Sequence, residues 1–265
     1  MDVNTLFGVQ GKVVLITGGA KGIGRMLATG FVTNGAKVYI TGRDAPACHA
    51  TVKDLNPLSR NGGSIHALPA NLQHLSECEK LAGQLAELET AGLHVLINNA
   101  GATWGADIDS HPDSAWTKLL TLNLQRVFTL TQLCLPLLEK AATKEDPARI
   151  IHIGSIDGIR VPTMANFAYS ASKAGLHHLS RHMARDLGFR NITSNVLACG
   201  PFRTKMMKAT LDAVGDALEG EIPLGRIGKD EDVAGSAIFL SSKAGAYLNG
   251  ALIRVDGGAS LVAKI

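Results

Sequence analysis

The sequence predicts an α/β protein built as a single doubly wound parallel sheet with helices on both faces. The first reason is a regular alternation of short apolar runs with segments of helical length along the whole chain. The second is a glycine-rich turn between the first apolar run and the first helical segment. With 265 residues, 46% of them hydrophobic, the chain can bury one full core. No linker or repeat divides it, so we expect one domain over residues 1–265.

The predicted strands are short apolar runs bounded by turn residues. They span Lys12–Thr17, Lys37–Thr41, Ser64–Leu68, His94–Asn98, Ile150–Ile153, Thr193–Leu197 and Ala251–Val255. The helical segments between them are the run up to Asn34, Ala45–Leu55, Leu75–Ala91, Pro112–Ala142, Asn166–Leu187 and Asp230–Ser241. Right-handed crossovers between parallel strands put such helices on both faces of the sheet.

Charge and cysteine usage exclude several classes of protein. The formal net charge is only +3 and no basic block occurs, so we expect neither a nucleic-acid nor a membrane-surface partner. The N-terminus lacks a secretory pattern and no apolar run reaches the ~18 residues that span a bilayer, which favours a cytoplasmic protein. The C-terminal Ala263–Ile265 is a near miss to a peroxisomal signal, and peroxisomal location is the alternative. The four cysteines form no CxxC pair and are expected to be reduced.

The first glycine turn predicts a dinucleotide site of Rossmann type. Gly18, Gly22 and Gly24 follow the strand Lys12–Thr17 in a GxxxGxG pattern and open a helix. Backbone amides at the positive end of a helix bind pyrophosphate, and glycine lets that backbone approach closely. The alternative is a tight turn that only packs the helix closely against the strand.

The end of the second strand indicates which dinucleotide binds. An acidic residue there suits the ribose of NAD, but this chain continues with Arg43. A guanidinium suits a 2′-phosphate, and Lys21 in the glycine turn can add a second positive charge, so we expect NADP(H). Two alternatives stay open: Arg43 is a solvated loop residue, or a one-residue shift places Asp44 at that position.

Tyr169 and Lys173 are candidate catalytic residues. They are four residues apart and share one face of a predicted helix. A neighbouring ammonium favours the phenolate, so we expect Lys173 to lower the pKa of Tyr169 and make it an acid and base near neutral pH. Ser155, before this helix, could hold the reacting oxygen. The alternative is an ordinary surface pair.

Four motifs occur in one order at compatible spacings: the glycine turn, Asn98–Gly101 (NNAG), Ser155, and Tyr169 with Lys173. In this combination the chain resembles the short-chain dehydrogenase/reductase family over essentially its whole length. The segments GSIDGIR and YSASKAGLHHLSR resemble β-ketoacyl reductases of the rhamnolipid-pathway type.

The resemblance implies roles for the matching residues. Tyr169 is the acid/base, Ser155 positions the substrate oxygen, Lys173 binds the nicotinamide ribose and Asn123 holds a water in a proton relay. The implied cofactor contacts are Gly18, Ala20, Lys21, Gly22, Ile23, Gly24, Arg43, Asn71, Leu72, Asn99, Ala100, Gly101, Tyr169, Lys173, Gly200 and Thr204. Three features depart from the family pattern: Asn71 replaces a common Asp, Cys199 precedes Gly200–Pro201, and the Ser155 to Tyr169 spacing is one residue long.

The expected activity is reduction of a substrate carbonyl by NADPH, which makes the protein a ketoreductase for a small-molecule ketone or an acyl thioester. An alcohol dehydrogenase working in the oxidative direction is one alternative. A sensor or scaffold that binds NADP without catalysis is another. Residues 202–225 resemble a substrate lid, with Met206, Met207, Leu211 and Val214 as apolar lining or as packing residues and Lys205 and Lys208 as contacts to an anionic carrier.

Assembly and metal content complete the expectations. The resemblance implies a homotetramer, or a homodimer, formed through the helices that carry Asn123 and Tyr169 and through the C-terminal strand. His178 and His182 are four residues apart, but no third ligand is evident, so we expect a helix surface and no metal.

Overall fold

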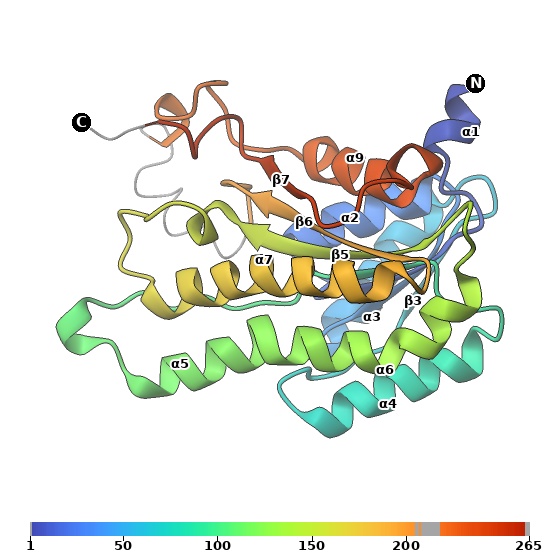
Figure 1. Cartoon of the computed structure of the whole chain (residues 1–265), viewed down its shortest axis with the longest axis horizontal. Helices are drawn as coiled ribbons and strands as arrows, with labels where there is room; N and C mark the ends of the chain where they lie inside the picture. The colour runs from blue at the N-terminus through green and yellow to red at the C-terminus, as the bar shows by residue number, and fades with distance from the viewer. Residues whose placement is uncertain (1, 205–206, 208–217, 263–265) are drawn as a thin grey trace.

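The computed structural model describes residues 2–204, 207 and 218–262. Within them the chain forms one parallel sheet in the order β3-β2-β1-β4-β5-β6-β7 (Figure 1). The strands are β1 Val13–Thr17, β2 Lys37–Thr41, β3 Ser64–Ala67, β4 Val95–Asn98, β5 Ala148–Ser155, β6 Ile192–Cys199 and β7 Leu252–Val255. Each predicted strand is confirmed. After β3, at one edge, the chain returns to the middle of the sheet and β4 pairs with the other side of β1. The point between β1 and β4 is therefore the switch point where such sheets bind ligands.

Helices cover both faces of the sheet, as expected (Figure 1). The short α1, Val3–Phe7, precedes the sheet; α2 Gly22–Thr33, α3 Ala45–Leu55 and α9 Asp230–Ser241 cover one face, and α4 Leu75–Leu88, α5 Asp113–Leu120, α6 Arg126–Ala141 and α7 Phe167–Gly188 cover the other. Strand β1 shows why two cores form. Val14 and Ile16 pack into the first core and Val13 and Leu15 into the second, because successive strand residues point to opposite faces.

The long helix predicted over Pro112–Ala142 is interrupted in the structure. A π-helical turn, Thr121–Gln125, separates α5 from α6 and holds the buried Asn123. A π-turn accommodates one extra residue and is frequent at functional sites. Nothing in the hydrophobic pattern indicates this insertion, since the apolar face continues on both sides of it.

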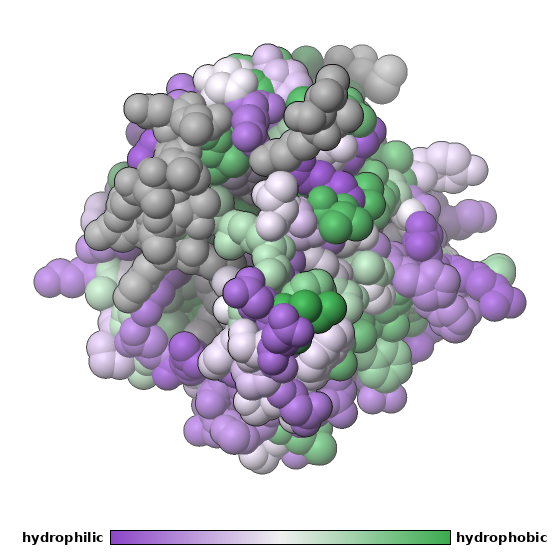
Figure 2. All heavy atoms as spheres, turned by 90° about the vertical axis from the view of Figure 1, so that its left-hand side faces the viewer, coloured by the Kyte–Doolittle hydropathy of each residue, from purple (hydrophilic) through white to green (hydrophobic). Residues whose placement is uncertain are grey.

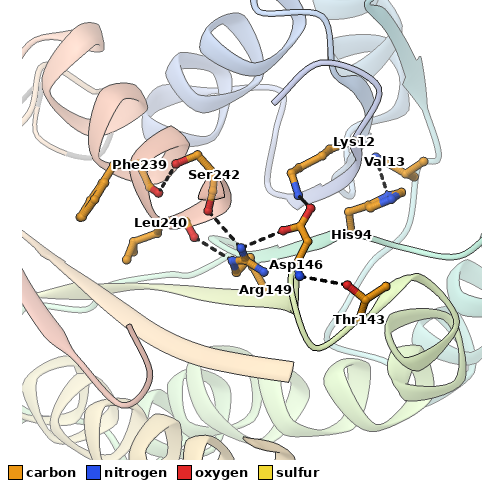
Figure 3. Close-up of polar contacts among 9 residues, drawn as sticks. All are labelled: Lys12, Val13, His94, Thr143, Asp146, Arg149, Phe239, Leu240 and Ser242. Carbon is orange, nitrogen blue, oxygen red and sulfur yellow. Dashed lines mark hydrogen bonds and ion pairs between the residues drawn. The ribbon is translucent and has the colours of Figure 1, made fainter. Parts of the chain in front are cut away.

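A buried charged cluster joins three elements where β5 begins (Figure 3). Arg149, only 1% exposed, donates to the carbonyl oxygens of Leu240 and Ser242, each at 3.0 Å, at the end of α9. Its Nη2 also lies 2.9 Å from the carboxylate of Asp146, whose other oxygen is 2.6 Å from Lys12 Nζ. These bonds link the starts of β1 and β5 to the end of α9, at the edge of the sheet opposite the carboxyl ends of the strands.

No helix in the described part of the chain is long and apolar enough to cross a bilayer.

Candidate active site

A cavity of about 1150 Å³ lies at the carboxyl edge of the sheet. The ends of β1, β2, β4, β5 and β6 and the loops that follow them supply its lining. Figure 2 looks onto this end of the molecule, where hydrophilic and hydrophobic side chains are interspersed. The cavity borders both the glycine turn and the catalytic candidates, so it can hold a dinucleotide and a substrate side by side.

The glycine turn is fixed by residues after β4. Asn99 donates through Nδ2 to the carbonyl oxygens of Thr17, at 2.7 Å, and Gly18, at 3.2 Å. The Thr17 hydroxyl in turn accepts from the backbone N–H of Asn99 at 2.9 Å. Gly18 and Gly22 border the cavity with φ values of +65° and +50°, which side-chain-bearing residues rarely adopt. The NNAG motif therefore positions the turn as well as lining the site.

Gly24 does not border the cavity, unlike the other two glycines of the turn. It is buried in the first turn of α2, where a Cβ would overlap the Gly18 carbonyl oxygen and lie 2.5 Å from Asn99 Nδ2. Gly24 therefore has a packing role in the turn, and its contact with the cofactor phosphates stays a prediction. The spacing alone could not separate the two roles.

Of the two cations predicted to bind a 2′-phosphate, Arg43 and Lys21, the structure pairs Lys21 with a carboxylate. Arg43 is exposed at the cavity and, among the described residues, forms no ion pair. Lys21 Nζ lies 2.8 Å from the carboxylate of Asp44, which also caps α3 by accepting from Ala47 N–H at 3.0 Å. Among the described residues Arg43 thus keeps an unpaired charge at the cavity, whereas the charge of Lys21 is partly neutralised.

Ser155, Tyr169 and Lys173 come together at the cavity, as predicted. Ser155 ends β5, and its Oγ accepts from the Asp157 backbone N–H at 3.1 Å. Lys173 is 5% exposed; its Nζ lies 5.7 Å from the centre of the Tyr169 ring and donates to the Ile153 carbonyl at 2.8 Å. The loop between β5 and α7 therefore absorbs the extra residue in the Ser155 to Tyr169 spacing.

The pKa of Tyr169 is raised in the structure, so the expected lowering is wrong. Burial raises the pKa of Tyr169 to about 12, and the hydrogen bond with Ser155 opposes this only in part. Burial also lowers the pKa of Lys173 to about 8, because the ammonium has left water. The sequence pattern predicts that Tyr169 and Lys173 lie together, but it does not predict that both are buried. Burial is the main cause of both pKa shifts.

Asn123 lies behind the cavity wall and does not line it. Its side-chain amide accepts from Ala102 N–H and donates to the Ala102 carbonyl, both at 2.9 Å, and donates to Ser172 Oγ at 3.0 Å. A Cβ on Gly101 would sit 3.3 Å from Asn123 Oδ1 and 3.7 Å from Lys173 Nζ, which places Asn123 close to the catalytic candidates. Both N–H groups of the side chain and one acceptor position of its oxygen are used in these bonds.

The remaining predicted cofactor residues all border the cavity: Ala20, Ile23, Asn71, Leu72, Ala100, Gly101, Gly200 and Thr204. Thr204 faces the glycine turn, since a Cβ on Gly22 would meet its Cγ2 at 3.1 Å. Cys199 is buried, and burial raises its thiol pKa to about 12, so it is an inert thiol. The cysteines are free and buried, as expected.

Several cavity residues have no counterpart in the prediction. Asp157, Arg160 and Asn166 line the cavity from the loop that follows Ser155. Their position directly after a predicted site strand is the signal that could have found them. From the expected lid, Met207 borders the cavity together with Leu218 and Ile222. Lys205, Met206, Lys208, Leu211 and Val214, like Ala263–Ile265, lie outside the described residues.

Comparison with known proteins agrees with this geometry. The short chain dehydrogenase family model matches residues 12–214. The rhamnolipids biosynthesis 3-oxoacyl-(acyl-carrier-protein) reductase of Pseudomonas aeruginosa is 42% identical over 254 residues, covering 95% of this chain and 97% of that protein. The Escherichia coli reductase FabG is 33% identical, covering 96% and 99%. The solved Pseudomonas aeruginosa RhlG/NADP active-site complex matches with a TM-score of 0.92 at 41% identity, covering 97% and 99% of the two chains.

The fold and the site define an oxidoreductase that works with a nicotinamide dinucleotide. The chain belongs to the short-chain dehydrogenase/reductase family. The resemblance to rhamnolipid-pathway reductases expected from the sequence is confirmed.

Proposed function

We propose that this protein is an NADP(H)-dependent ketoreductase that reduces 3-oxoacyl thioesters or similar ketones. The observation that carries the proposal is one cavity bordered by the glycine turn, by Arg43 and by Ser155, Tyr169 and Lys173. Relatives named as 3-oxoacyl-(acyl-carrier-protein) reductases support the substrate class, and the relative solved with NADP supports the cofactor. The Arg43 guanidinium, which forms no ion pair with the described residues, favours the phosphorylated dinucleotide, which in cells generally serves reduction.

The residues of the cavity fit that cofactor. A Cβ on Gly18 would lie 2.9 Å from Asn99 Nδ2, so glycine at this position lets the turn close against the loop after β4. Arg43 supplies the charge for a 2′-phosphate, and Lys173 lies where it can hold the nicotinamide ribose. Bound NADPH supplies the hydride.

Residues of the chain bind the substrate oxygen and supply its proton. Ser155 Oγ binds the substrate oxygen, and Tyr169 Oη donates its proton to that oxygen as hydride reaches carbon. The ammonium of Lys173, held by Ile153, keeps positive charge beside the phenol and stabilises the phenolate that remains. Burial of Tyr169 keeps the phenol protonated before reaction, so it begins as the acid that reduction requires.

Asn123 acts through position rather than direct contact. Its bonds to Ala102 and Ser172 tie the π-turn to the wall of the cavity and to α7. Its backbone, in a turn whose regular hydrogen bonding is disrupted, can hold a water that reprotonates Tyr169 through Lys173. We place the protein in the cytoplasm as a homotetramer.

The test follows NADPH absorbance with 3-oxoacyl thioesters and simple ketones. Wild-type enzyme should reduce at least one of them, and Tyr169→Phe should lower kcat/KM by about 10²- to 10⁴-fold while binding NADPH normally. Tyr247→Phe is the matched control, because Tyr247 is fully exposed and lies outside the cavity. Wild-type turnover in Tyr169→Phe would disprove the assignment. NADPH binding without turnover of any ketone or alcohol would favour a sensor.

A further inference from the structure

Arg160 occupies the substrate side of the cavity. It belongs to the loop after Ser155, and its backbone N–H donates to the Ile156 carbonyl at 2.9 Å. Its Nη1 donates to the Ala259 carbonyl at 2.6 Å, beyond β7. The guanidinium is therefore held between two segments that are distant in sequence, and one end of it is anchored.

The rest of this guanidinium has no partner in the described part of the chain. Its Nε is buried without a hydrogen bond, and no carboxylate of the described residues lies within 4 Å of the group. Its neighbours at the cavity include the apolar Ile156, Ile222 and Ala259. The side chain is half-buried, so its buried Nε is the donor left without a partner, and an oxyanion in the cavity would gain charge-assisted hydrogen bonds from the guanidinium.

The nearest acidic residue along the loop does not neutralise Arg160. Asp157 accepts a hydrogen bond from Asn166 Nδ2 at 2.9 Å instead of pairing with the guanidinium. Burial raises the pKa of Asp157, and the charge of Arg160 opposes this rise only in part. The substrate side of the cavity therefore keeps a positive group that the reaction does not use.

We propose that Arg160 binds an anionic oxygen group of the substrate and gives the enzyme a preference for carbonyl compounds that carry one. This inference rests on the proposed ketoreductase function and narrows its substrate class. The carboxylate of a free 3-oxo acid and the phosphate of a phosphopantetheine thioester share this chemistry. Both present oxygens that a guanidinium binds through charge-assisted hydrogen bonds.

The experiment compares two matched substrate pairs. The first is 3-oxooctanoate and its methyl ester, and the second is the 3-oxooctanoyl thioester of phosphopantetheine and that of pantetheine. Arg160→Gln removes the charge but keeps a donor for Ala259, and Arg160→Met removes both. Arg254→Gln is the control, because this exposed arginine on β7 makes the same change of charge outside the cavity.

Arg160→Gln should raise KM for the anionic member of one pair by about 10- to 100-fold and leave its neutral partner within about twofold. Selectivity in the first pair assigns a carboxylate, and selectivity in the second assigns a phosphate. Equal effects on charged and neutral members, or no effect, would overturn the inference, as would the same selectivity in Arg254→Gln.

A binding measurement separates this inference from the proposed function. If wild-type enzyme reduces none of these ketones, the proposed function fails. Binding of octanoate and of phosphopantetheine to the NADPH-saturated protein, followed by ligand-observed NMR, then decides the role of Arg160. Loss of either signal in Arg160→Gln supports an anion site, and unchanged signals overturn it.

Discussion

The ammonium of Lys173 donates a hydrogen bond to the carbonyl oxygen of Ile153 across 2.8 Å. This bond crosses from α7 to β5 and holds the lysine beside Tyr169. Because the ammonium is also buried, its pKa falls to about 8. The positive charge that assists Tyr169 is thus present at neutral pH and lost within the range where enzymes can be assayed.

Reduction should therefore weaken as pH rises through about 8. Below that value Lys173 is charged and stabilises the phenolate, and above it the neutral amine cannot. We expect kcat/KM for a ketone, measured from pH 6 to 10 with saturating NADPH, to fall by about tenfold per pH unit above the break. A profile that stays level to pH 10 would contradict this role.

Stability measurements provide an independent check on Lys173. Its folded pKa lies below its unfolded value of 10.5, so the unfolded chain binds more protons between about pH 8 and 10.5 and unfolding becomes harder as pH rises. The shift corresponds to roughly 3 kcal/mol at most. Burial of the Cys199 thiol and of Tyr169 acts in the opposite direction over this range. Denaturant unfolding at pH 7 and pH 10 should therefore give a change in stability that is more favourable in the wild type than in Lys173→Met.

Arg43 should decide the cofactor preference. Arg43→Ala removes the exposed guanidinium at the cavity and should raise KM for NADPH by about 10- to 100-fold, with KM for NADH changed by less than about threefold. Lys21→Ala should act more weakly, since Lys21 is paired with Asp44. Arg25→Ala, outside the cavity and paired with Asp54, is the control. Equal effects of Arg43→Ala on both cofactors would remove the 2′-phosphate assignment.

Two glycines in helices should respond to alanine in opposite ways. Gly24→Ala places a Cβ against Gly18 and Asn99, so we expect loss of NADPH binding and destabilisation by roughly 1 to 3 kcal/mol. Gly83→Ala, in the exposed interior of α4 with no atom within 4 Å of the new Cβ, should stabilise by about 0.5 to 1 kcal/mol. Thermal unfolding and NADPH fluorescence measure both variants. Normal cofactor binding by Gly24→Ala would contradict its packing role.

The cluster in Figure 3 should give a pH-dependent contribution to stability. Burial raises the pKa of Asp146, but the hydrogen bonds and charges of Lys12 and Arg149 outweigh this and lower it. Asp146→Asn should lower the free energy of unfolding by roughly 1 to 3 kcal/mol at pH 7, because the buried Arg149 loses its counter-charge. The loss is limited because Asp146 is a third exposed and solvent screens its charge.

That cost should shrink as pH falls. A carboxyl with a lowered folded pKa contributes stability above its unfolded pKa of about 3.9 and loses it as pH falls through the folded value. Urea unfolding at pH 7 and pH 3 would measure the difference. Glu139→Gln, whose pair with Arg190 is exposed, should change stability by less than about 1 kcal/mol. A pH-independent cost of Asp146→Asn would show that the hydrogen bonds, and not the charge, matter.

Much of the site follows from local pattern. Three short-range signals were sufficient: the strand runs, the glycine turn and the four-residue spacing of Tyr169 and Lys173. All seven predicted strands agree with the described sheet. The cavity brings nearly all the predicted cofactor residues together because they follow the carboxyl ends of parallel strands. Chain order therefore implies proximity in this fold.

Burial and long-range partners could not be predicted in the same way. Asp44 reads as a rival to Arg43 in the sequence, yet in the structure it caps α3 and pairs with Lys21. The lid expected over residues 202–225 is a resemblance, and most of its central part lies outside the described residues. Arg160 carries no motif, and only its bond to Ala259, far along the chain, places its guanidinium in the cavity.

The sequence by itself determined the parallel α/β fold, the family and the candidates for the reacting residues, since periodicity, glycine spacing and residue chemistry are local properties of the chain. Only the tertiary structure decided that Gly24 packs closely against Gly18 and Asn99, that Asn123 sits in a π-turn, and that burial raises the pKa of Tyr169 while lowering that of Lys173. These properties depend on how much water and which distant groups surround each side chain, and packing alone sets both.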